Sequence, residues 1–537
     1  MGLFVNPGMG SLLEDMNDDI YVDKSLIIAE LNRCYGSRRR FVCVSRPRRF
    51  GKTMVGNLVA AYYTRGADAR GVFGRLKIGR ERGWDAHLNR ANVVKIDMNW
   101  FYGVYGRSGR VVEGLTRDVV AELAAEFPGA GLEPEMNLAV AVVRVYAATG
   151  VRFVFIVDEY DVLFRERGVS RADQDEYLSL LNTLFKASAG AEAVALAYLT
   201  GILPIARDKV QSKLNNFDEY TMLRPMEMAP HLGFTLSEVR ALCDEAGVDY
   251  AECLRWYDGY RLSESVSVCN PNSVCMAVRT GAFGDYWNST GSYRAVSDYV
   301  DMNFDGSRDG IAAMLAGGGV RVDVRSFLNT LSDFGGRDDL FTYLVHLGYL
   351  AYDGASGECR IPNGEMRGEW VVALARSRCF RGMADVVEAS RDLLAATLAA
   401  DEEAVARGLD RAHQEATSPL TYNNEGSLQS AIGMAYFYAR ADYNIVREMP
   451  AGRGYADMAF LPLRPGRRAF VVELKMAGAP GGAVAQARGR RYADALAPYG
   501  GEALIVGVAY DSKTKRHTCK IERIGDETAN AYRPPKP

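Results

Sequence analysis

The chain has 537 residues, about half of them apolar and about a quarter charged, with a formal net charge of −3. This length is too great for one hydrophobic core, so roughly two to four domains are expected, and the near-neutral balance excludes a globally basic nucleic-acid-binding protein. No CxxC pair, signal-peptide pattern or apolar run of the roughly 18 residues that a membrane helix needs is present, so we expect a cytoplasmic protein without a membrane span.

The first two hundred residues alternate short apolar runs with helical patterns. The expected strands are 41–44, 92–98, 153–157 and 193–199. A helix is expected over 53–63, directly after the first strand. Apolar strands that alternate with helices are typical of a parallel sheet covered on both faces. We therefore expect an α/β domain over residues 1–230.

Helical periodicity dominates from about Phe234, where Thr235 and Glu238 form a capping box at the start of a helix. We expect a helical region over 231–389 and a second α/β domain over 390–537. That domain opens with helices. Its expected strands lie near 456–460, 469–474 and 503–508, with a helix at about 483–496 between the last two.

The segment from Ser45 to Thr53 reads SRPRRFGKT and stands between a strand and a helix, which is the context of a phosphate-binding loop. A helix N-terminus offers free N–H groups and a positive dipole end to phosphate after Gly51. Lys52, which we expect to be exposed, would reach the β- and γ-phosphates, and the Thr53 hydroxyl would ligate Mg²⁺. Arg46 replaces the first glycine of the motif; either a phosphate contact or a solvated basic turn fits it.

The apolar run 154–157 ends in Asp158 and Glu159, the form of a strand whose tip presents carboxylates to a nucleotide. Asp158 would hold Mg²⁺ and Glu159 would orient the attacking water. The alternative is a buried strand that runs into an acidic loop. Thr200 ends the next apolar run, where it would contact the γ-phosphate or form an ordinary loop. Both motifs together predict binding and hydrolysis of ATP with Mg²⁺.

Asp457, Glu473 and Lys475 form a second candidate site. Glu473 and Lys475 are two apart on an expected strand and share one face. With Asp457 they would form a metal-dependent phosphodiesterase centre, in which carboxylates hold Mg²⁺ and Lys475 positions the nucleophile. The alternative is a hairpin with a surface salt bridge.

Strand register decides whether these side chains can meet. A two-residue hairpin centred on Pro465-Gly466 pairs residues whose numbers sum to 931, and this places Asp457 on the wrong face. A loop with an odd number of residues, or one bulge, changes the sum of the paired residue numbers to 930 or 932. Asp457 then lies opposite Glu473 or Lys475. The phosphodiesterase interpretation therefore requires that irregularity.

The helix after this strand carries Gln486 and Arg490, which share a face as i, i+4 neighbours. This face would contact DNA phosphate or remain solvated. Upstream, Glu425 opens another helix and is a candidate additional metal ligand.

Several segments resemble the bacterial AAA-ATPase-like family. They are 21–25, 46–53, 157–161, 200–203, 256–260, 269–273 and 286–291. The string RPRRFGKT is highly specific to that family, where Arg46 is usual. The pieces 424–426, 454–457, 473–475 and 486–492 resemble the PD-(D/E)XK nuclease domain, with its restriction-endonuclease-like α/β fold, that is usually fused to it.

The resemblance implies a P-loop NTPase fold, a helical middle region and a C-terminal nuclease domain. It implies ATP contacts at Lys52, Thr53, Asp158 and Glu159. It also implies a nuclease centre whose residues are Asp457, Glu473, Lys475 and Gln486.

Two main functions stay open at this point. The first is an ATP-binding and ATP-hydrolysing protein with a DNA nuclease domain whose cleavage is gated by the ATP state. The second is a nucleotide-dependent switch or scaffold whose C-terminal domain binds nucleic acid or protein without cleaving. A third, remodelling without a nuclease, needs a homo-oligomeric ring and an arginine from a neighbouring copy, for which Arg207 is a candidate.

Overall fold

The computed structural model describes most of the chain. The described residues are 2–166, 168–205, 214–287, 301, 304–315, 318–327, 334–376, 381–416, 428, 432–433, 435–436, 438–439, 442–451, 454–462, 467–476, 479–490, 492, 496 and 502–524. Glu425 and Arg207, both singled out above, lie outside them, as does the turn at 463–466.

The contacts divide the chain into two compact units. The first comprises Met1–Trp287 and Gly319–Asn363, and the second Asn288–Gly318 and Gly364–Pro537. The region expected at 231–389 is therefore shared between the units, because residues 319–363 pack with the first and 364–389 with the second.

The first unit is built on a five-stranded parallel sheet in the order β2-β3-β4-β1-β5. Its strands are β1 (Phe41–Ser45), β2 (Asn92–Asp97), β3 (Phe153–Asp158), β4 (Val194–Gly201) and β5 (Asp218–Tyr220). The first four confirm the expected strands. β5 was not expected, because its three residues Asp-Glu-Tyr carry no apolar run.

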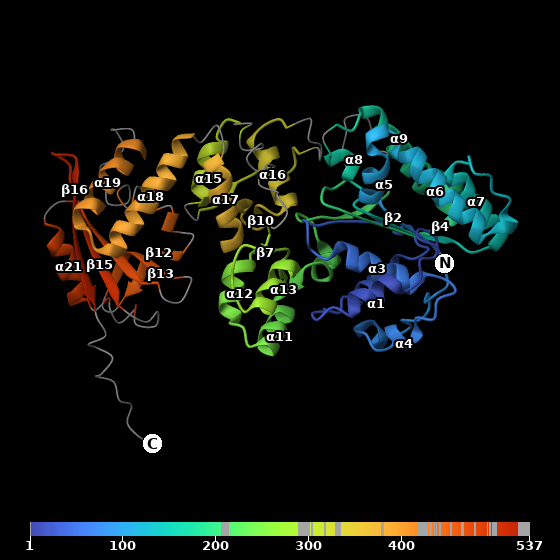
Figure 1. Ribbon diagram of the computed structural model, residues 1–537, viewed down its shortest axis with the longest axis horizontal. Coiled ribbons are helices and arrows are strands. Elements are labelled where there is room, and N and C mark those ends of the chain that lie inside the picture. Colours follow the sequence, from blue (N-terminus) through green and yellow to red (C-terminus); the bar gives the residue numbers. More distant parts are fainter. Residues whose placement is uncertain are drawn as a thin grey trace, which may run out of the picture. The chain divides into compact units, whose positions relative to one another are not determined.

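Helices cover both faces of this sheet, as alternate strand residues require. Val154 and Ile156 pack with one helix group, whereas Phe155 and Val157 pack with the other. The first group is α1 (Gly10–Met16), α2 (Ile27–Cys34), α3 (Lys52–Tyr63) and α4 (Arg70–Phe73). The second is α5 (Met98–Tyr105), α6 (Val111–Glu126), α7 (Leu138–Thr149), α9 (Arg171–Phe185) and α10 (Ser188–Ala193), with α8 (Val162–Arg165) beside them. Figure 1 shows α1, α3 and α4 on one side of the sheet and α5, α6, α7 and α9 on the other. The P-loop NTPase fold expected from the sequence is confirmed.

The remaining helices and strands of the first unit are short. It contains the 3-10 helix η4 (Met226–His231), β6 (Phe234–Thr235), α11 (Leu236–Ala246), α12 (Tyr250–Tyr257), β7 (Tyr260–Arg261), β8 (Ser267–Cys269) and α13 (Pro271–Thr280). The capping box of Thr235 and Glu238 is present at the start of α11. From the second segment come β9 (Val320–Arg321), α16 (Arg337–Leu347), β10 (Ala351–Asp353) and β11 (Glu358–Arg360).

The second unit is an α/β domain on a mixed sheet in the order β12-β13-β14-β15-β16. Its strands are β12 (Tyr443–Ala451), β13 (Gly454–Pro462), β14 (Phe470–Lys475), β15 (Ala503–Asp511) and β16 (Arg516–Ile524). Its helices are α15 (Ser307–Leu315), α17 (Gly364–Arg376), α18 (Arg381–Ala399), α19 (Glu402–Ala416) and α21 (Pro480–Gly489). β14 and β15 are parallel, and α21 connects them.

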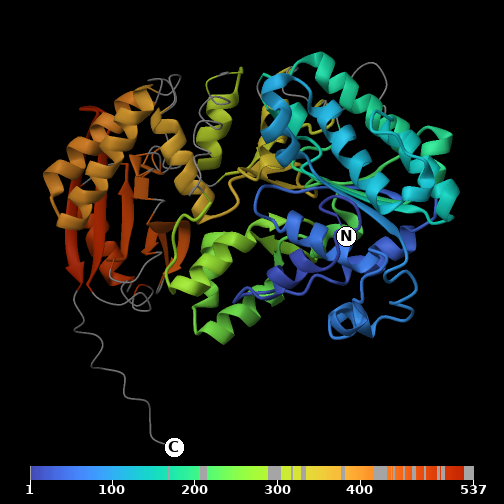
Figure 2. The same ribbon diagram turned by 45° about the vertical axis from the view of Figure 1, so that its right-hand side comes forward.

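The two faces of this sheet are covered differently. Side chains of α18 and α19 pack on one face, and α21 packs on the other; Figure 2 shows the first pair, in orange, over the red strands. The three strands expected in this domain correspond to β13, β14 and β15. Among the described residues, no helix has both the length and the apolar character needed to cross a membrane.

Candidate functional site

The loop between β1 and α3 shapes the first site. Gly51 has φ +80° and no neighbouring atom within 4 Å of an added Cβ, so the backbone conformation rather than space favours glycine there. Lys52 follows and is only 5% exposed. Its Nζ donates to the carbonyl oxygens of Arg46 (3.2 Å) and Pro47 (3.0 Å). The expectation of an exposed Lys52 is therefore wrong, because the side chain folds back under its own loop.

Asp158 lies at the carboxyl end of β3 and accepts hydrogen bonds from two hydroxyl groups. Thr53 Oγ1 donates to its Oδ2 at 2.6 Å, and Thr200 Oγ1 donates to its Oδ1 at 2.5 Å. Asp158 and Thr200 are buried, whereas Thr53 at the start of α3 is exposed. The structure thus brings together three residues that the sequence placed on one helix and two strands.

Glu159 follows Asp158 with φ +51°, a left-handed conformation that is uncommon for a residue other than glycine. Both of its carboxylate oxygens face cations: Oε1 lies 3.3 Å from Lys52 Nζ and Oε2 lies 2.5 Å from Arg165 Nη2. Burial raises the pKa of Glu159, but the charges of Lys52 and Arg165 outweigh it and hold the pKa below its usual value.

Asp161 anchors the other side of this network. Its Oδ2 accepts the backbone N–H groups of Ile202 (3.1 Å) and Leu203 (2.8 Å) and lies 2.8 Å from Arg165 Nε. Gly201 lies so close that an added Cβ would be 2.6 Å from Asp161 Oδ1. The segment Thr200–Leu203 is therefore fixed against the turn that contains Glu159 and Asp161.

A cavity of about 380 Å³ opens beside this loop. Its lining includes Gly51, Lys52, Thr53 and Glu159 of the site, together with the charged residues Asp18, Lys24, Arg49 and Arg279. Its apolar side chains include Ile20, Tyr21, Val22, Leu58, Phe234, Pro271 and Cys275. The cavity can therefore accommodate a ligand that has both charged and apolar parts.

Arg46 lies away from this cavity. Its guanidinium is fully buried and donates to the carbonyl oxygens of Ser45 (2.9 Å), Tyr220 (3.2 Å) and Met228 (3.4 Å). Burial lowers the pKa of Arg46 to about 10. A solvated basic turn is thus wrong for Arg46, and its contacts tie the loop to β5 and η4.

β2 carries polar side chains that belong to no sequence motif. Lys95 Nζ donates to Asn57 Oδ1, and Asn57 Nδ2 donates to Asp15 Oδ2 at 2.8 Å. Asp97, at the end of β2, pairs in register with Asp158. The signal was present in the sequence, since Lys95 and Asp97 interrupt an otherwise apolar strand at alternate positions.

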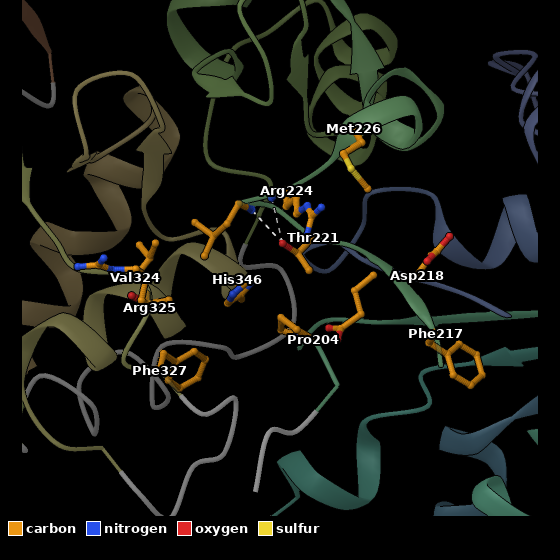
Figure 3. A pocket seen from close by; sticks show the side chains of 13 residues that line it. Pro204, Phe217, Asp218, Thr221, Arg224, Met226, Val324, Arg325, Phe327 and His346 are labelled. Atoms are coloured by element: carbon orange, nitrogen blue, oxygen red, sulfur yellow. Dashed lines mark hydrogen bonds between the residues drawn. The ribbon is translucent and has the colours of Figure 1, made fainter. Parts of the chain in front are cut away.

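A second cavity of about 370 Å³ lies between β5 and α16 (Figure 3). Two charged side chains on it are paired within the protein: Asp218 with Arg39 at 2.8 Å, and Arg325 with Asp323 at 2.9 Å. These charges are already neutralised, and we assign no ligand to this cavity.

In the second unit, β13 and β14 pair with numbers that sum to 930, as in Met458 with Val472. This register is one of the two that the phosphodiesterase interpretation requires, and its continuation sets Asp457 opposite Glu473. Asp457 Oδ2 accepts the backbone N–H of Leu474 at 2.7 Å.

Gln486 links Glu473 to Lys475. Its Nε2 donates to Glu473 Oε1, and its Oε1 accepts from Lys475 Nζ at 2.6 Å. Glu473 is 2% exposed, and its Oε2 is buried without a hydrogen bond. Burial and the nearby charge of Asp457 raise the pKa of Glu473 to about 7.

A metal site in this unit rests on few described ligands. Within the described residues there is no group of three or more His, Cys, Asp or Glu side chains that could hold a metal ion. Glu425, expected as a further ligand, lies outside those residues. On the helix face, Arg490 Nη1 donates to Tyr492 at 3.3 Å, and Arg488 pairs with Glu522 at 3.0 Å.

Comparison with known proteins adds one family match. Residues 14–211 match the AAA-ATPase-like family model, described as "Predicted AAA-ATPase". The match includes β1 to β4 and the loop between β1 and α3, so this segment is an AAA-ATPase-like domain.

Among solved structures, the chain is similar to the one titled "Structure of the Aeropyrum Pernix ORC2 protein (ADPNP-ADP complexes)". The two are 10% identical, the likeness covers 66% of this chain and 95% of that chain, and the TM-score is 0.33. Comparison with curated proteins gave no match.

Proposed function

We propose that the first unit binds ATP with Mg²⁺ and hydrolyses it. The observation that carries this proposal is the convergence on Asp158 of the hydroxyl groups of Thr53 and Thr200, beside Lys52 and Glu159. A helix start, a cation and hard oxygen ligands are the groups that a polyphosphate and its metal need. The AAA-ATPase-like match of residues 14–211 supports the same reaction.

In the first unit, Thr53 and Asp158 are the residues that fit Mg²⁺. The Thr53 hydroxyl and the Asp158 carboxylate are 2.6 Å apart and supply oxygen atoms, which Mg²⁺ prefers. When bound, the ion neutralises the charge that develops on the phosphates. Thr53 is exposed, so its hydroxyl can turn from Asp158 to a ligand.

The other residues of the site have separate roles. Lys52 leaves its loop carbonyls and Glu159 to reach the phosphates, and Glu159 then orients the attacking water. Thr200 holds Asp158 and senses the γ-phosphate. Apolar side chains of the cavity, Tyr21 and Phe234 among them, receive the base. Arg46 is left out of the phosphate contacts because its guanidinium is buried among carbonyl groups.

The test compares Lys52→Ala, Glu159→Gln and Asp158→Ala by phosphate release and by binding of a fluorescent ATP analogue. Lys52→Ala abolishes turnover. Glu159→Gln binds the analogue but turns over slowly, whereas Asp158→Ala also loses Mg²⁺-dependent binding. Wild-type turnover by Lys52→Ala contradicts the phosphate-loop assignment, and equal binding loss in the other two contradicts their division of roles.

We propose, as a second activity, metal-dependent DNA cleavage at Asp457, Glu473 and Lys475. The observation that favours it is the 930 register with the buried Glu473 Oε2, which together leave two carboxylates close and one oxygen unbonded. Mg²⁺ held there lowers the pKa of a bound water, and Lys475, positioned by Gln486, stabilises the charge on phosphorus. The alternative is a switch or scaffold whose second unit binds nucleic acid or protein without cleaving.

Plasmid incubated with Mg²⁺, with and without ATP, separates these alternatives. Glu473→Ala abolishes cleavage and keeps ATP hydrolysis near wild type. Lys52→Ala changes cleavage without touching Asp457, Glu473 or Lys475 if the ATP state gates the second unit, since ATP shifts such an equilibrium only by its differential affinity. Full cleavage by Glu473→Ala contradicts the assignment of cleavage to Asp457, Glu473 and Lys475, and absence of cleavage by the wild type favours the switch or scaffold. A cytoplasmic location and a homo-oligomer stay predictions.

A further inference from the structure

Asp97 lies at the end of β2, the strand next to β3. It pairs in register with Asp158, and the two strands are parallel, so both residues stand at the carboxyl edge of the sheet. Val93 packs on the α3 face of the sheet, as do Val154 and Ile156 of β3. Because side chains alternate along a strand, Asp97 and Asp158 point to that same face.

The carboxylate of Asp97 has a fixed direction. Its Oδ1 accepts the backbone N–H groups of Asn99 (2.9 Å) and Trp100 (3.4 Å) at the start of α5. Both hydrogen bonds use the same oxygen, and the residue as a whole is exposed at the strand tip. Oδ2 of Asp97 is therefore the oxygen that this arrangement leaves for a ligand or a water.

Glu159 is less well placed to orient the attacking water than the sequence suggests. Each of its carboxylate oxygens lies against a cation, Lys52 on one side and Arg165 on the other. ATP would withdraw Lys52, but Arg165 is also held by Asp161 at 2.8 Å and stays in place. One oxygen of Glu159 thus remains neutralised by a partner that the nucleotide does not displace.

We propose that Asp97 is a second water-orienting carboxylate of the ATPase site, acting beside Glu159. This inference rests on the proposed ATP hydrolysis. Asp97 Oδ2 accepts a hydrogen bond from the attacking water. The water oxygen bonds to the γ-phosphorus, the bond from that phosphorus to the β,γ-bridging oxygen breaks, ADP keeps the bridging oxygen, and the released proton passes to solvent.

A purely structural role for Asp97 makes a different prediction. Asp97 is the N-cap of α5, and asparagine caps a helix about as well as aspartate. Asp97→Asn therefore keeps the cap and removes only the charge. Asp249, the N-cap of α12, accepts from the Glu252 N–H and is also exposed, so Asp249→Asn is the matched control at another cap of the same unit.

The experiment measures kcat for ATP, the Kd of a fluorescent ATP analogue with Mg²⁺, and Tm for wild type, Asp97→Asn, Asp249→Asn and Glu159→Gln. We expect Asp97→Asn to lower kcat by about 100-fold, the lower end of the range for positioned acid–base groups. The Kd of this variant equals that of the wild type or falls, because one negative charge near the triphosphate is removed. Its loss of Tm is no larger than that of Asp249→Asn.

Wild-type kcat in Asp97→Asn, with Glu159→Gln impaired, overturns the inference and leaves the proposed ATPase intact. A parallel loss of binding and Tm in Asp97→Asn also overturns it, in favour of a cap. Absence of turnover in the wild type contradicts the ATPase proposal itself, and with it the inference.

Discussion

The ion pair between Lys52 and Glu159 gives a sharp test of the contacts in the first site. We consider Lys52→Met, Glu159→Gln and the double variant, each of which removes one charge or both while keeping most of the side-chain volume. Lys52 is buried under its loop, so its replacement must change stability as well as ATP turnover. The double-mutant cycle isolates the part of that change that belongs to the pair.

The magnitude follows from the geometry. At 3.3 Å and an effective dielectric constant of about 20, the attraction is roughly 5 kcal/mol before desolvation is subtracted. Arg165 continues to neutralise Glu159 when Lys52 is lost, so the full cost of about 3–5 kcal/mol for breaking a buried pair is not reached. We expect a coupling free energy of about 1–3 kcal/mol.

Urea unfolding followed by tryptophan fluorescence measures this coupling. Trp84, Trp100, Trp256 and Trp287 lie in the first unit and Trp370 lies in the second, so all four proteins carry Trp370→Phe to make the signal report the first unit. The m value has to stay constant across the four proteins for the midpoints to be read as free energies. Saturation with a non-hydrolysable ATP analogue should reduce the coupling, because the phosphates then compete for Lys52.

A coupling below about 0.3 kcal/mol, within the usual error of additivity, would refute the pair as a stabilising contact. A coupling that is unchanged by the analogue would show that Lys52 does not leave Glu159. The second result would also weaken the proposed role of Lys52 at the phosphates.

Three further predictions follow from other contacts. Thr200→Val removes a buried hydroxyl from Asp158, so it should lower the unfolding free energy of the first unit by about 1.5–3 kcal/mol and slow ATP turnover. Thr200→Ser keeps the hydroxyl and should restore both. Equal urea midpoints for the two variants would contradict this prediction. Gly201→Ala places a Cβ 2.6 Å from Asp161 Oδ1 and should cost about 1–3 kcal/mol, while Gly71→Ala, with nothing within 4 Å, serves as the neutral control in the same denaturation assay. Because the pKa of Glu473 is raised from 4.5 to about 7, the folded state holds its proton longer and stability should fall as pH rises through that window; Glu473→Gln should therefore raise the Tm of the second unit more at pH 8 than at pH 5, and an equal gain at both would contradict the shift.

The sequence predicted the sheet of the first unit where its strands are buried on both faces. β1, β3 and β4 are buried along their length and mainly apolar, and β2 keeps Val93, Val94 and Ile96, so these runs stand out against the helices between them. β5 has no such run and is recognisable only from its pairing with β1. The edge strands β12 and β16 were missed for a similar reason, since exposed polar residues are interspersed along them.

The candidate site was predictable as a list of residues but not as a set of contacts. A motif places Lys52 and Asp158 near a phosphate, because strand ends and helix starts meet at one edge of the sheet. It does not show that Arg46 is buried, since its partners Tyr220 and Met228 are 174 and 182 residues away in the chain. Asp97 was overlooked because no motif includes it, although its register with Asp158 places it at the same edge.

In the second unit, the strand register bears on the choice between the two interpretations of Asp457, Glu473 and Lys475. The sequence allowed 930, 931 or 932, and only the long-range pairing of β13 with β14 could select 930. The alternative of a surface salt bridge needs an exposed strand, yet Glu473 is 2% exposed and Lys475 donates to Gln486 instead. The buried carboxylate of Glu473 faces the half-buried Asp457, and the charge of Asp457 favours the neutral form of Glu473. Such a pair does not stabilise the fold, and it becomes favourable only when a proton or a cation lies between the two groups. The nuclease proposal supplies that cation as Mg²⁺, which is why the buried Glu473 opposite the half-buried Asp457 supports it more strongly than the spacing of the residues in the sequence.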